Sequence, residues 1–88
     1  MSRIADPARV VRLARAVVSD IVTYHPDLVR AGLANDDLFE RMASELAEGR
    51  EYFEERVEPL AAERTNAWNR ALVDVLVYRS KHVRSRIW

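Results

Sequence analysis

Apolar residues recur at helical spacing from the start of the chain. Asp6-Pro7 is typical of an N-cap followed by proline at the first helical position, and it predicts a helix from Pro7 to about Tyr24. Its apolar positions form a main stripe and a second stripe about 100° further round the helix. The main stripe consists of Val10, Leu13, Ala14, Val17, Ile21 and Tyr24, and the second stripe consists of Val11, Val18 and Val22. So wide an apolar arc predicts that this helix packs between two others.

Prolines divide the rest of the chain. The residue before a proline avoids the helical region, so His25-Pro26 ends the first helix, and Pro26 opens a short connecting helix that Gly32 weakens. Asn35 is the predicted N-cap of a helix that runs to about Val57. After the break at 58–59, a last helix is predicted into the low eighties. The pattern therefore predicts an all-α domain over residues 1–88, a small helical bundle of three long helices plus one short connecting helix.

The last predicted helix is apolar nearly all round between Ala71 and Tyr78, where Asp74 is the one polar residue. A segment of this kind lies either at the centre of a core or at an interface. Its β-branched residues would also suit a strand, although the surrounding helical period favours a helix. Asp74 could be a buried functional acid, but pairing one turn away or a place at an interface edge is favoured. Trp68 is predicted to anchor the core.

The amino-acid composition limits the cellular compartment and the kinds of chemical site that we expect. The 88 residues include no cysteine, which excludes a disulfide framework, a thiolate metal site and a thiol nucleophile. The N-terminus lacks the apolar stretch of a signal peptide, and no apolar run approaches the roughly 18 residues that cross a bilayer. We therefore expect a soluble, cytoplasmic protein. Thirteen arginines against the single Lys81 are typical of a GC-rich bacterial genome.

The charges are sorted along the chain although they cancel overall. Residues 36–58 hold nine carboxylates against three arginines, and residues 64–86 hold six basic residues against Asp74. A neutral chain with one acidic and one basic segment is suited to bringing opposite surfaces together, within itself or between copies.

Signals of enzymatic chemistry are thin. His25 and His82 are the only histidines, and neither belongs to a metal-binding pair. The glutamates of the third helix lie opposite its apolar face, which favours a solvated acidic face over a metal site. Gly32 and Gly49 form no phosphate-binding loop; Gly49 marks either a close helix approach or a weak point. We predict no catalytic residue, no cofactor and no metal.

The C-terminal stretch offers the strongest case for a charged ligand. It mixes basic and aromatic residues, as nucleic-acid binders do: Arg79, Lys81, Arg84 and Arg86, with Tyr78 and Trp88. On a helix these cations spread round the circumference and form no single stripe. Charge pairing within or between chains is therefore the favoured interpretation, and nucleic acid, a membrane surface or another anion is the alternative.

Three short motifs carry a family resemblance across residues 12–57. They are the SDI-x-x-Y-x-P turn from Ser19 to Pro26, the connection from Gly32 to Phe39, and the EGR-x-x-F/Y-x-x-R run from Glu48 to Arg56. This stretch resembles a helical accessory module of uncharacterised deltaproteobacterial and myxobacterial proteins, some of which carry zinc-ribbon segments. The resemblance implies a helical domain without known chemistry. It supplies no catalytic residue, and a chain without cysteine holds no zinc ribbon.

The excess apolar surface of the first and last helices indicates association. We expect a non-enzymatic protein–protein interaction or adaptor module, either a homodimer or a part of a larger assembly. Hydrophobic burial would supply the affinity, and the charges would set register and association rate. The predicted interface residues are Val11, Val18, Val73, Val77, Tyr78 and Trp88. The competing class is a nucleic-acid-binding protein that uses the basic C-terminal helix.

Overall fold

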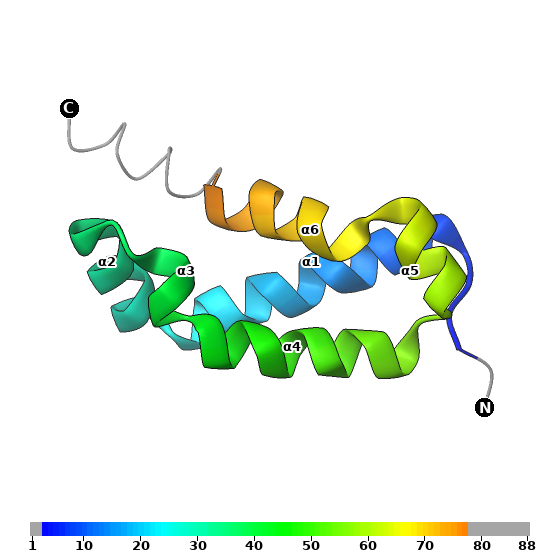
Figure 1. Cartoon of the computed structure of the whole chain (residues 1–88), viewed down its shortest axis with the longest axis horizontal. Helices are drawn as coiled ribbons and strands as arrows, with labels where there is room; N and C mark the ends of the chain where they lie inside the picture. Colours follow the sequence, from blue (N-terminus) through cyan, green and yellow to red (C-terminus); the bar gives the residue numbers. More distant parts are fainter. Residues whose placement is uncertain (1–2, 78–88) are drawn as a thin grey trace.

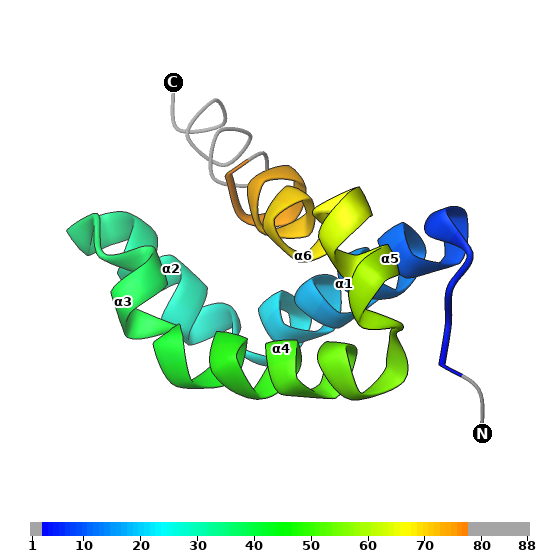
Figure 2. The ribbon, with the colours of Figure 1, turned by 45° about the vertical axis from the view of Figure 1, so that its right-hand side comes forward.

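The computed structural model describes residues 3–77, with only the backbone of residue 77, and this part of the chain is all-α, as predicted. The helices are α1 (Pro7–Tyr24), α2 (Pro26–Asn35), α3 (Leu38–Arg41), α4 (Ala43–Arg56), α5 (Pro59–Thr65) and α6 (Ala67–Ala71), followed by the π-helical turn η1 (Leu72–Val77). In both views α1 lies between α4 on one side and α6 with η1 on the other (Figures 1 and 2). These elements, here called the three-helix body, confirm that α1 packs between two others.

The start of α1 follows the predicted chemistry. The Asp6 carboxylate accepts a hydrogen bond from the backbone N–H of Arg9 at 3.3 Å, and Pro7 occupies the first turn. His25 ends α1, where its backbone N–H donates to the carbonyl of Ile21 at 3.1 Å. Near the N-terminus, Ile4 forms an isolated β-bridge with Val57. Its N–H donates to the carbonyl of Arg56, and its carbonyl accepts from the N–H of Glu58, which joins the start of the chain to the end of α4.

The core of the body is built from one residue of α1 per turn and from aromatic rings opposite them. The α1 residues are Val10, Ala14, Val18 and Val22. The rings of Phe53 and Trp68 pack with centroids 5.7 Å apart and an interplanar angle of 36°. Trp68 is buried, so its predicted role as a core anchor is confirmed.

Gly49 marks a close approach of helices, the first of its two interpretations. A Cβ atom at this position would lie 2.5 Å from Cδ1 of Ile21 and 3.2 Å from the Trp68 ring. The absence of a side chain lets α4 come near both α1 and α6. The three helices of the body therefore lie close together at this position.

The predicted third helix begins later and is interrupted. Asn35 is the last residue of α2 and not an N-cap, because Asp36 adopts the left-handed conformation with φ 58° and ends that helix. Short polar side chains such as those of Asn35 and Asp36 tolerate this conformation and compete with the helical backbone. A second break follows at Met42, with φ −102° and ψ 12°, where the buried side chain separates α3 from α4. We call α2 and α3 together the α2–α3 hairpin; it extends beyond one end of the body (Figure 1).

The predicted last helix is also divided. Asn66 adopts φ 50°, and its N–H donates to the carbonyls of Ala62 and Glu63, so α5 ends there and α6 begins in a new direction. Beyond Ala71 the helix widens into the π-helical turn η1. The prediction of three long helices and one short one is therefore wrong in number, while the break at Glu58-Pro59 is confirmed.

Within residues 3–77, no helix has both the length and the apolar character that a bilayer-spanning segment requires.

Candidate interaction surfaces

The predicted interface residues have different surroundings. Val73 of η1 is 56% exposed, although Val75 and Leu76 in the same turn are buried. Val11 is half-buried at the edge of the core. The backbone of Val77 ends η1, while its side chain lies outside the described residues, as do Tyr78 and Trp88.

Val18 requires a correction. Its side chain has no exposed surface, because it points into the core of its own chain. A fully buried residue contacts no partner while the fold stays closed, so Val18 belongs to the core and Val11 alone remains at the edge of the second stripe.

Some of the charged residues that were singled out from the sequence lie in the described part of the chain, and others lie outside it. The four cations Arg79, Lys81, Arg84 and Arg86 lie outside the described residues. Asp74 is exposed, which removes its interpretation as a buried acid. The predicted acidic face is solvent-exposed as expected, at Glu40, Glu48, Glu51, Glu54, Glu55 and Glu58. Among residues 3–77, no group of three metal-ligating side chains is near enough to hold an ion.

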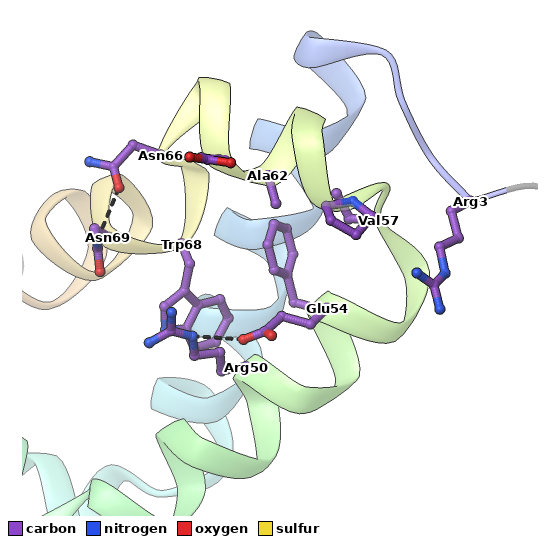
Figure 3. A pocket seen from close by; sticks show the side chains of 11 residues that line it. Arg3, Arg50, Glu54, Val57, Ala62, Asn66, Trp68 and Asn69 are labelled. Atoms are coloured by element: carbon purple, nitrogen blue, oxygen red, sulfur yellow. Dashed lines mark hydrogen bonds and ion pairs between the residues drawn. The ribbon is translucent and has the colours of Figure 1, made fainter.

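One groove, of about 510 Å³, separates α4 from α5 and α6 (Figure 3). Its floor is apolar and includes Phe53 and Trp68. Two pairs of polar side chains lie at its rim: Arg50 Nε lies 2.8 Å from Glu54 Oε1, and Asn69 Nδ2 donates to Asn66 Oδ1 at 2.9 Å. Arg3 and Glu63 also line this groove, so its charged groups are of both signs.

A second groove, of about 460 Å³, runs between α1 and α4 and is here called the α1–α4 groove. It is lined by carboxylates at Asp20, Glu45 and Glu48, and by the rings of Tyr24 and Tyr52. Its floor is apolar, formed by Leu13, Val17, Ile21 and Gly49. Acidic groups, aromatic faces and an apolar floor together suit a long cationic side chain, whose aliphatic stem packs while its head is paired.

Two details of the α1–α4 groove bear on that chemistry. Oε2 of Glu45 is buried and has no hydrogen-bond partner among the described residues. The guanidinium of Arg56 lies 3.4 Å from the centroid of the Tyr52 ring. The ring of Tyr52 thus already holds a cation on one face, and one carboxylate oxygen of Glu45 is without a partner inside the described part of the fold.

A bidentate ion pair lies elsewhere, in the α2–α3 hairpin. Arg41 Nε and Nη2 donate to the two carboxylate oxygens of Asp37 at 3.0 and 2.9 Å. This hydrogen bonding holds the pKa of Asp37 below its ordinary value and raises that of Arg41. The pair joins residues one turn apart, so it stabilises a short helix and does not form part of either groove.

The sequence pattern did not reveal the α1–α4 groove, although part of its signal was present. Asp20 and Tyr24 are four residues apart, and Glu45, Glu48 and Tyr52 follow at spacings of three and four. Each set lies on one flank of its helix. What joins the two flanks is the packing of α1 on α4, which depends on the space left at Gly49.

Comparison with known proteins gives no significant match to any family model, curated protein or solved structure. The resemblance of residues 12–57 to the helical accessory module stays a prediction.

Proposed function

We propose that this chain is a non-enzymatic protein–protein interaction module that associates with a second copy of itself through η1 and the neighbouring edge of α1. A cytoplasmic location is part of the proposal, supported by the composition without cysteine. An adaptor role in a larger assembly would use the same surface.

The observation that carries the proposal is the exposure of Val73 in a turn that is apolar except for Asp74. Val75 and Leu76 of η1 are buried against the body, and α1 is one of the elements on which η1 packs. π-helical turns are rare and occur frequently at functional sites. Full burial of a valine side chain is worth about 1.5–3 kcal/mol, and covering the exposed part of Val73 with a second copy would contribute about half of that to association.

A matched pair of variants tests the surface. Val73 and Leu60 are both 56% exposed and both lie in short helical elements, but Leu60 is in α5 and outside the proposed interface. Val73→Lys should raise the dimer dissociation constant about tenfold or more, because a charge would have to be desolvated in the contact. Leu60→Lys should leave it unchanged within about threefold.

Sedimentation velocity over a concentration series gives both constants. Circular dichroism confirms that each variant is folded, and Val73→Ala is the milder substitute if the lysine variant is not. Equal weakening by the Val73 and Leu60 substitutions, or no effect of either, would contradict the proposed surface.

The competing prediction assigns nucleic acid to Arg79, Lys81, Arg84 and Arg86. Binding through phosphates weakens steeply as salt rises. A titration of the full chain with duplex DNA and with RNA at low salt separates the two classes. No binding at low salt removes the nucleic-acid alternative.

A further inference from the structure

The acidic α1–α4 groove is not used by the contact proposed at η1, which makes it a separate surface. We infer that this groove binds the basic segment 79–86 of a second copy of the chain. The inference rests on the proposed self-association and names a second contact within it.

Charge complementarity identifies the occupant. The groove carries three carboxylates, at Asp20, Glu45 and Glu48. Segment 79–86 carries four cations, at Arg79, Lys81, Arg84 and Arg86, and no acid. Opposite charges on two surfaces of one chain steer copies together and fix their orientation.

The side chains of the groove also match arginine in shape and chemistry. Arg56 on the Tyr52 ring shows that this ring accepts a guanidinium at 3.4 Å. Tyr24, on the opposite wall, is 78% exposed and has a ring face available. The apolar floor accommodates the aliphatic stems of arginine and lysine.

The proposed self-association makes a second copy the occupant, because it already brings two copies of the chain together. Within one chain, η1 packs on α1 and α6, and α4 lies on the side of α1 opposite α6 in both views (Figures 1 and 2).

Charge reversal tests the pairing. Asp20 and Glu48 are exposed, so Asp20→Lys with Glu48→Lys reverses the groove without disturbing the core. Arg84→Glu with Arg86→Glu reverses two of the four cations and leaves segment 79–86 without net charge. At low salt each double variant should raise the dimer dissociation constant about tenfold, as expected for disrupted charge pairs at an interface. The chain with all four substitutions should recover to within about threefold of the original.

A control with the same net charge excludes a general charge effect. Glu40→Lys with Glu51→Lys changes two exposed glutamates that line neither groove. Combined with Arg84→Glu and Arg86→Glu, it gives a neutral chain in which the three carboxylates of the groove face two new carboxylates at positions 84 and 86, and this chain should not recover. Equal recovery in both neutral chains would overturn the inference.

Sedimentation velocity separates failure of the inference from failure of the proposed function. If the original chain dimerises and the reversals leave its dissociation constant unchanged, the inference is wrong and self-association stands. A change in thermal stability without a change in association would place the segment in its own chain and would also overturn it. If the original chain is a monomer throughout, both proposals fail.

Discussion

The three-helix body and the α2–α3 hairpin are both helical, but different forces hold them. In the body, fully buried side chains such as Val10, Met42 and Phe53 pack against aromatic and aliphatic neighbours. In the hairpin, Gly32 is the one buried residue of α2, and α3 has none. Tertiary packing of buried side chains stabilises the first. The second packs on the core only through partly buried side chains such as Leu28, Val29 and Leu38, and a tight helix contact and an ion pair add to its stability. Helical periodicity alone therefore does not reveal which segments contribute to stability.

The largest expected effect comes from replacing a phenylalanine with alanine, once in the body and once in the hairpin. Phe53 is 1% exposed, and Phe39 of the hairpin is 48% exposed. Phe53→Ala leaves a cavity in the core and should lower the free energy of unfolding by about 3–5 kcal/mol. Phe39→Ala removes about half as much buried surface and should cost about 1–2 kcal/mol.

Urea denaturation followed by circular dichroism measures both free energies. A cost at Phe39 equal to that at Phe53 would show that the hairpin is part of the same core, and would break the comparison.

The next largest effect is expected from replacing each of the two glycines with alanine. A Cβ atom at Gly32 would lie 2.7 Å from the backbone Cα of Leu38, which cannot rotate away. Gly32→Ala should therefore destabilise the α2–α3 contact by about 1–3 kcal/mol. At Gly49 the nearest atom is the terminal Cδ1 of Ile21, which can rotate. The gain in helix propensity of about 1 kcal/mol then offsets the crowding, and Gly49→Ala should be close to neutral.

Amide hydrogen exchange locates the change, because Gly32→Ala should lose protection in α2 and α3 and keep it in α1 and α4. The opposite ranking of the two glycines would mean that the body, and not the hairpin, has the tighter backbone contact.

The smallest effect is a pH dependence of the hairpin. The hydrogen bonds from Arg41 lower the pKa of Asp37 in the folded state below its ordinary value of 3.8. A depressed folded pKa contributes stability that is present above the unfolded pKa and is lost as the pH falls through the folded pKa. The wild-type hairpin should lose protection in that acid range.

Asp37→Asn isolates this contribution, because it removes the titrating group and keeps a similar shape. The variant should have less protection at neutral pH and should lose less on acidification, as measured by hydrogen exchange at α3. Identical acid profiles for the two chains would show that the pair does not stabilise the hairpin.

The parts of the fold that follow from local chemistry could be predicted from the sequence. Asp6-Pro7 starts α1 and His25-Pro26 ends it, because capping and proline geometry act over a few residues. The core role of Trp68 follows from its place in an apolar stripe. The breaks at Asp36 and Asn66 were missed because Asp and Asn are also good N-caps, and their left-handed conformation is chosen by the packing around them.

The candidate surfaces were predictable only in part. The exposure of Val73 agrees with an apolar run that exceeds what the core can bury, whereas Val18 lies on the side of α1 that the body covers. The α1–α4 groove depends on contact between helices some 30 residues apart in the chain. Such a contact is set by tertiary packing at Gly49 and leaves no single local motif.

The most direct test of self-association is the mass of the full chain in solution across a concentration series. The monomer mass is 10.2 kDa. We expect the weight-average mass to rise above this value toward that of a dimer as the concentration reaches high micromolar. A mass that stays at the monomer value over the whole series would contradict self-association.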